Sequence, residues 1–166
     1  MTSGRDSFGH LSHTEAMKFG KPGINFHFAD HPKKFFGATG GFITCGGDHQ
    51  DKCYKLGSNE SFASMMKIRA HAASIVLDNE KLWVLGGSDS RSRLSSTEYI
   101  FSDGRTGEGP PMPIALMGHA MVKINRTTSF MVGGSGYGSV RIKKSWYYSG
   151  KWIEGPDLAK EKVAIH

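Results

Sequence analysis

Two apolar runs near the middle of the chain predict a β-hairpin. The first spans residues 71–77, and the second, residues 82–85, ends in the pair Gly86-Gly87. Between them lies a short polar turn that contains Asp and Asn, as hairpin turns often do. A glycine pair directly after a strand marks a point where the backbone bends or passes close to another strand. This stretch therefore predicts two antiparallel strands followed by a close backbone approach.

The same order of features recurs twice more along the chain, around Gly46-Gly47 and around Gly133-Gly134. A histidine precedes the first glycine of each pair by 15, 15 and 14 residues, and successive histidines are 40, 48 and 47 residues apart. These histidines are His31, His71, His119 and His166. A period of about 40 to 50 residues with hairpin signals is typical of propeller blades.

A polar loop and an aromatic-centred strand follow each glycine pair. The strands are expected at residues 52–56, 97–101 and 145–148. A fourth segment, residues 150–158, follows in the last copy, and residues 104–113 correspond to it in the second copy. The repeating unit is therefore expected to contain four strands.

A glycine pair after the second strand, tyrosine in the third and tryptophan in the fourth resemble the kelch repeat. Two departures are visible: Thr106 stands where the second copy should have tryptophan, and Phe62 is the nearest aromatic residue in the first copy. The resemblance implies structural roles for Gly46, Gly47, Tyr54, Gly86, Gly87, Tyr99, Gly133, Gly134, Tyr147 and Trp152.

The resemblance implies an all-β fold, an incomplete kelch-type β-propeller of about three four-stranded blades plus the first strand of a fourth. Residues 1–28 form a poorly defined N-terminal segment. The repeats are expected at about 29–66, 67–113 and 114–157, and a fourth begins at 158–166. Because propellers close with about 4 to 8 blades, the missing blades are expected from a longer chain or, alternatively, from a second copy.

Composition and charge narrow the classes of partner. With 38% hydrophobic residues and 22 glycines among 166, the chain is typical of a turn-rich β protein. Its net charge of +6 is spread along the sequence, which speaks against a nucleic-acid surface but leaves an acidic partner open. No apolar run is long enough to cross a bilayer, so we expect no membrane insertion.

No residues form a recognisable catalytic constellation. His10, His13 and His27 of the N-terminal segment, and His31 just after it, lack Cys, Asp or Glu partners in a known metal geometry. We therefore expect no metal, no cofactor and no enzyme activity, and we expect a protein-interaction module.

The resemblance also places Cys45 and Cys53 on neighbouring strands, where they could face each other in a disulfide; two buried free thiols are the alternative. Asn59 and Asn125 each begin an N-glycosylation acceptor triplet in an expected loop. The Cys-Gly-Gly and Cys-Tyr pattern is similar to that of secreted invertebrate kelch-like proteins. Together these features favour an extracellular over a cytoplasmic location.

Loops that join the second and third strands of kelch repeats project from one face, where these proteins bind partners. The expected contact residues here are Arg91 and Arg93 in one loop and Tyr137 and Arg141 in the next. A merely solvated loop is the alternative for either arginine of the first loop. The family also includes substrate receptors of cullin ubiquitin ligases, which carry BTB domains, and copper enzymes resembling galactose oxidase; both remain alternative functions.

Overall fold

The computed structural model describes residues 5–6, 9–10, 38–40, 43–47, 50–55, 58, 60–77 and 81–159. Strands and loops make up these residues almost entirely, so the fold is all-β, as expected. The one helical element among the described residues is the 3-10 turn η1 (Tyr137–Ser139). A small hairpin near the N-terminus pairs β1 (Arg5–Asp6) with β2 (Gly9–His10).

Three four-stranded antiparallel sheets form the body of the molecule, and in each the strands pair in chain order. Sheet I contains β3 (Ala38–Gly40), β4 (Ile43–Cys45), β5 (Lys52–Lys55) and β6 (Ser61–Ser64). Sheet II contains β7 (Ala73–Leu77), β8 (Lys81–Leu85), β9 (Thr97–Phe101) and β10 (Thr106–Gly109). Sheet III contains β11 (Ala120–Lys123), β12 (Ser129–Val132), β13 (Ser145–Tyr148) and β14 (Trp152–Glu154). The prediction of four strands per unit is confirmed.

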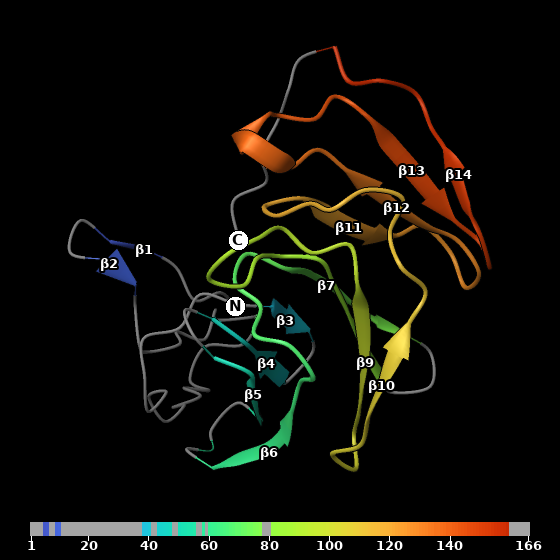
Figure 1. Ribbon diagram of the computed structural model, residues 1–166. Helices are drawn as coiled ribbons and strands as arrows, with labels where there is room; N and C mark the ends of the chain where they lie inside the picture. Colours follow the sequence, from blue (N-terminus) through green and yellow to red (C-terminus); the bar gives the residue numbers. More distant parts are fainter. Residues whose placement is uncertain are drawn as a thin grey trace, which may run out of the picture.

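The three sheets are arranged like a fan (Figure 1). Their first strands are neighbours, since β3 lies against β7 and β7 against β11. The fourth strands, β6, β10 and β14, lie on the outside. Residues 65–72 connect sheet I to sheet II, and residues 110–119 connect sheet II to sheet III.

Strand β8 is buried on both faces, which explains why its sequence is a continuous apolar run and not an alternating one. Leu82 and Val84 belong to the core between sheets I and II. Trp83 and Leu85 belong to the core between sheets II and III. The central hairpin therefore supplies both hydrophobic layers of the molecule.

Trp83 is the centre of the second layer. Only 1% of it is exposed, and its ring centroid lies 4.8 Å from that of Tyr148 and 6.0 Å from that of Trp152. Its indole Nε1 donates a hydrogen bond of 2.9 Å to Thr97 Oγ1. Burying so large a ring with its polar atom satisfied stabilises the contact between sheets II and III.

The glycine pairs lie where the connecting segments pass over the ends of the second strands. All six glycines have positive φ, which side chains rarely adopt. The second glycine donates its amide to the connector: Gly47 N to Arg69 O at 2.9 Å, and Gly87 N to Leu116 O at 2.8 Å. A Cβ on Gly87 would lie 2.6 Å from the Ala70 carbonyl oxygen, so only glycine permits this approach.

The strand pairing corrects two details of the repeat. Ala73 and Ala120 hold equivalent positions, because each pairs with the residue before its glycine pair. His71 therefore corresponds to Gly118, not to His119, and both His71 and Gly118 have positive φ. The feature that the two repeats share at this position is a residue with left-handed backbone, not a histidine.

The tyrosines of the third strands also differ in register. Tyr99 pairs with Trp83 and Tyr147 with Phe130, and both partners stand three residues before a glycine pair. Tyr54 pairs with Thr44, which stands only two residues before its pair. Tyr54 is therefore on the opposite face of its sheet from that of the other two, because strand side chains alternate.

The outer face of sheet III carries a row of apolar side chains. Val122, Phe130, Tyr147 and Ile153 are successive cross-strand partners, so they share one face. Val122 is 53% and Ile153 is 49% exposed, and the two rings between them are half-buried. Trp83 and Tyr99 are the corresponding residues of sheet II, and they pack against sheet III.

Candidate protein-interaction surface

The loop between β8 and β9 is folded on itself around Asp89. The Asp89 Oδ1 accepts hydrogen bonds from the amides of Arg91 at 2.8 Å and Ser92 at 2.7 Å. These amide donors hold the pKa of the Asp89 carboxyl below its ordinary value. A backbone bridge between Ser88 and Arg93 closes the loop and leaves Arg91 exposed at its tip.

The loop between β12 and β13 has a comparable closure. Ser135 and Arg141 form a backbone bridge, and η1 lies between them. Tyr137, the first residue of η1, is 95% exposed, and Val140 is 59% exposed. This loop therefore presents an aromatic and an aliphatic side chain to solvent beside the exposed Arg141.

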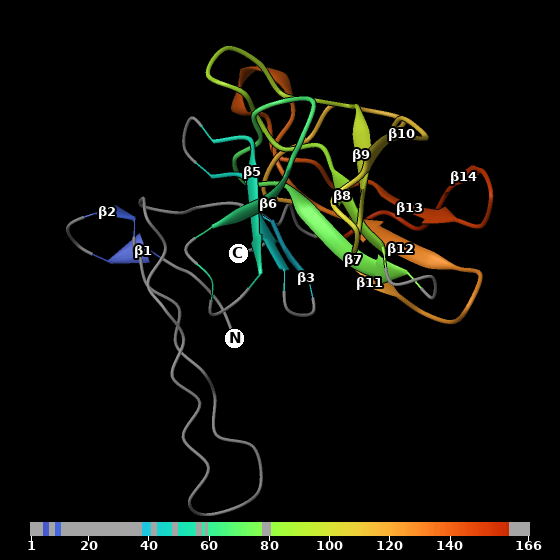
Figure 2. The ribbon, with the colours of Figure 1, turned by 90° about the horizontal axis from the view of Figure 1, so that it is seen from below.

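Arg93 joins the two loops, which project from the same side of the sheets (Figure 2). Its Nη2 donates a hydrogen bond of 3.2 Å to Ser139 Oγ in η1. Its Nε is buried and has no hydrogen-bond partner among the described residues. We call this surface, formed by Arg91, Arg93, Tyr137, Val140 and Arg141, the basic loop surface.

The basic loop surface carries three arginines beside one carboxylate, that of Asp89, whose charge interacts with that of Arg91. Arg91, Arg93 and Arg141 form no ion pair within the part of the chain that the structure describes. Asp89, the acidic residue of the same loop, directs its carboxylate to backbone amides. The guanidinium groups of Arg91 and Arg141 are therefore available for an acidic ligand, whereas Arg93 is half-buried and uses its Nη2 to hold Ser139.

A buried ion pair holds the base of the β8–β9 loop in place. Arg69, in the connector from sheet I, and Glu98, on β9, each expose 1% of their side chains, with Arg69 Nη2 and Glu98 Oε1 2.9 Å apart. Arg69 Nη1 donates to the carbonyls of Gly86 and Ser96, at 2.8 Å each. These two residues are the ends of the loop, so Arg69 fixes the loop that carries Arg91 and Arg93.

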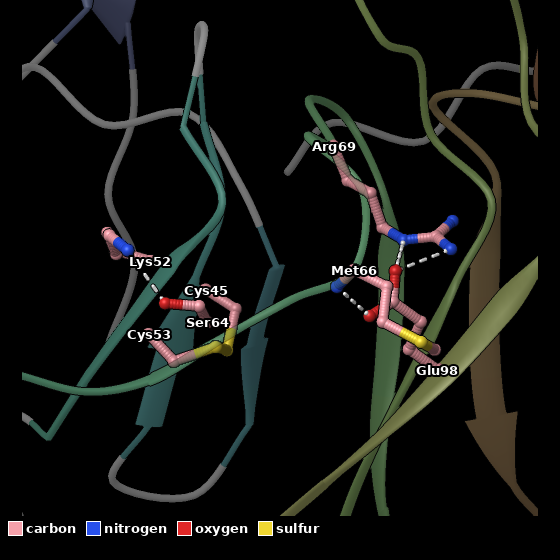
Figure 3. The surroundings of a disulfide bond; sticks show 7 residues. All are labelled: Cys45, Lys52, Cys53, Ser64, Met66, Arg69 and Glu98. Carbon is pink, nitrogen blue, oxygen red and sulfur yellow. Dashed lines mark hydrogen bonds and ion pairs between the residues drawn. A yellow bond between two sulfur atoms is a disulfide. The ribbon is translucent and has the colours of Figure 1, made fainter. Parts of the chain in front are cut away.

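The Glu98 carboxylate is bonded to backbone amides as well as to Arg69 (Figure 3). Its carboxylate accepts hydrogen bonds from the amides of Met66 at 2.7 Å and Lys67 at 3.2 Å. Burial lowers the pKa of Arg69, and Glu98 acts in the opposite direction by stabilising the charged guanidinium. Sequence reasoning missed both residues, because each stands alone in the sequence and only the fold brings them together.

A disulfide joins Cys45 and Cys53, as expected (Figure 3). The two residues are direct cross-strand partners on β4 and β5, and neither is exposed to solvent. The bond joins the second and third strands of sheet I, which are the counterparts of the strands that flank the loops of the basic loop surface in sheets II and III. Sheet I is thus cross-linked next to its glycine pair.

Several expected features lie outside the described residues. These include Asn59, His31, most of residues 1–28 and the end of the expected fourth repeat, residues 160–166. Asn125 is described and lies in the exposed turn between β11 and β12.

Comparisons with known proteins do not identify a family: no family model matches the chain, and no curated protein matches it. Within the described residues, no group of three or more His, Cys, Asp or Glu side chains is placed to hold a metal ion. No helix in this part of the chain has the length and apolarity needed to span a bilayer.

Proposed function

We propose that this chain is part of a kelch-type β-propeller that binds a protein partner without catalysis. The four-stranded sheets, their adjacent first strands and the glycine pairs at equivalent positions support a propeller-like arrangement. The partner contacts the basic loop surface and presents acidic side chains to it.

The contact between Arg93 and Ser139 is the observation that carries this proposal. It links loops 46 residues apart in sequence into one surface that combines three arginines with a nearly fully exposed tyrosine. Arginine and tyrosine are the residues that most often dominate binding energy at protein interfaces. Arginine also pairs with carboxylates through two parallel hydrogen bonds.

The outer face of sheet III supports a further part of the proposal. Val122, Phe130, Tyr147 and Ile153 correspond in register to the face of sheet II that buries Trp83. A further sheet, from a longer chain or from a second copy, packs on this face in the complete assembly. Exposed apolar rows of this kind are otherwise a liability for aggregation.

The disulfide favours an extracellular setting over the cytosolic one of a BTB-linked ubiquitin-ligase adaptor, since structural disulfides persist mainly in oxidising compartments. A thiol count on protein from its native source tests this choice: no free thiol supports secretion, and two free thiols support the adaptor.

Binding of defined peptides tests the interaction surface. A labelled peptide rich in Asp and Glu is titrated against the protein, with a Lys-rich peptide of equal length as the reference. Neutralising Arg91, Arg93 and Arg141 together with glutamine lowers the affinity for the acidic peptide on the order of tenfold, at about 0.2–1 kcal/mol per exposed pair.

The matched control removes three charges elsewhere. Lys55, Lys67 and Lys151 are exposed and lie outside the basic loop surface, and their joint replacement by glutamine leaves the affinity within about twofold. Equal losses in the two triple variants would show that net charge alone drives binding, and the proposed surface would then be wrong.

A further inference from the structure

The turn between β11 and β12 is built around an asparagine whose carboxamide is held on one side only. Asn125 Oδ1 accepts hydrogen bonds from Thr127 N at 2.9 Å, Thr127 Oγ1 at 3.1 Å and Thr128 N at 2.9 Å. Its Nδ2 has no hydrogen-bond acceptor among the described residues. The amide nitrogen is therefore not occupied by the fold.

Accessibility is the second requirement for modification of this nitrogen. Asn125, Arg126 and Thr127 are all exposed, and the neighbouring Ile124 is 54% exposed. The triplet Asn-Arg-Thr has the acceptor pattern of N-glycosylation, with no proline at its centre. The hydrogen bond from Thr127 Oγ1 brings the hydroxyl and the carboxamide of this triplet together.

We propose that Asn125 is an N-glycan acceptor. The donor is a lipid-linked oligosaccharide diphosphate. The Nδ2 nitrogen forms a bond to the anomeric carbon as the bond from that carbon to the diphosphate oxygen breaks, the lipid diphosphate leaves, and Nδ2 loses one proton. The buried disulfide shows that the fold accommodates the oxidised cysteines expected in the compartment where this reaction occurs.

The position of the acceptor leaves the basic loop surface open. Asn125 precedes β12, and the loop with Tyr137 follows it, so the two lie at opposite ends of this strand. Four residues of strand separate them by about 13 Å. A glycan on Asn125 thus projects from the end of β12 that lies opposite to the proposed partner site. Glycosylation at Asn125 is therefore independent of whether a partner binds.

Secretion of the full 166-residue chain from eukaryotic cells, behind a cleavable signal peptide, tests the assignment. The other acceptor triplet of the sequence is removed by Asn59→Gln. Enzymatic release of N-glycans in heavy-oxygen water is followed by peptide mass spectrometry. We expect the peptide that contains Asn125 to carry the heavy-oxygen mark of a released glycan.

Three variants complete the test. Asn125→Gln and Thr127→Ala lose the glycan, whereas Thr127→Ser keeps it because serine retains the hydroxyl. Secreted protein has been exposed to the enzyme that transfers the lipid-linked oligosaccharide. An unmodified Asn125 peptide in the secreted Asn59→Gln protein therefore overturns the proposal. Affinity for the acidic peptide is expected to be equal before and after glycan release, which separates this result from that of the binding experiment.

Discussion

At the scale of single residues, the second glycines of two pairs, Gly87 and Gly134, are constrained by both conformation and space. Gly134 has φ +92, and a Cβ there would lie 2.8 Å from His119 Cβ and 2.9 Å from the Met117 carbonyl oxygen. Gly138, in η1, also has positive φ, at +64, but a Cβ there would meet nothing within 4 Å. An alanine at Gly138 would therefore suffer backbone strain alone, whereas an alanine at Gly134 would suffer both backbone strain and steric crowding.

Replacing each of these glycines with alanine is expected to give different losses of stability. Both variants incur about 1 kcal/mol of left-handed strain, and Gly134→Ala adds about 1–3 kcal/mol of overpacking. Urea unfolding monitored by tryptophan fluorescence measures the difference. Equal unfolding free energies for the two variants would contradict the close approach at Gly134.

Replacing one residue of the buried Arg69–Glu98 ion pair leaves the other charge buried without a partner, which lowers the stability of the fold. Arg69→Met is expected to lower the free energy of unfolding by about 3–5 kcal/mol, since Glu98 stays buried without its cation. The double variant with Glu98→Leu recovers part of this loss, because two apolar side chains replace two charges. A double-variant loss larger than that of Arg69→Met would argue against this explanation.

Some of these residue roles could be predicted from the sequence, and others could not. The glycine pairs are visible because two adjacent glycines end an apolar run, and the strand-end approach they predict is present. Arg69 and Glu98 carry no local signal, because their pairing depends on a contact between a connector and a strand 29 residues away. The histidine spacing was misleading, because the position requires a left-handed residue and not a histidine.

At the scale of elements, the strands were predicted more accurately than their registers. The expected strand at residues 97–101 coincides with β9, and the one at 145–148 with β13. Apolar content and turn residues locate a strand, but a one-residue shift such as that of Tyr54 leaves both unchanged. Register is set by pairing with the neighbouring strand, which the linear pattern does not contain.

The disulfide between β4 and β5 is expected to stabilise sheet I by restricting the unfolded chain. Its cysteines are 8 residues apart, and closing so short a loop contributes about 2–3 kcal/mol. Unfolding of the wild type in oxidising and reducing buffer measures this difference. A Cys45→Ala, Cys53→Ala variant is the control, since its stability is expected to be the same in both buffers.

At the scale of the whole molecule, the packing of one sheet on the next determines what remains exposed. Sheet II buries one face against sheet I and the other against sheet III, as β8 shows with side chains in both hydrophobic clusters. Among the described residues, nothing equivalent covers the row from Val122 to Ile153 on sheet III. This row is therefore the face on which a further sheet would pack.

The 166-residue protein is expected to associate through this face in a concentration-dependent manner. Val122→Glu with Ile153→Glu places two charges in the row and lowers the average sedimentation coefficient at high protein concentration, because apolar burial no longer offsets their desolvation. The control is Met66→Glu with Val76→Glu, whose side chains are 51% and 44% exposed and lie outside the row. If the control lowers association equally, added charge is the cause and the face has no specific role. A loss confined to the row variant, with urea unfolding unchanged, identifies sheet III as the edge at which the assembly continues.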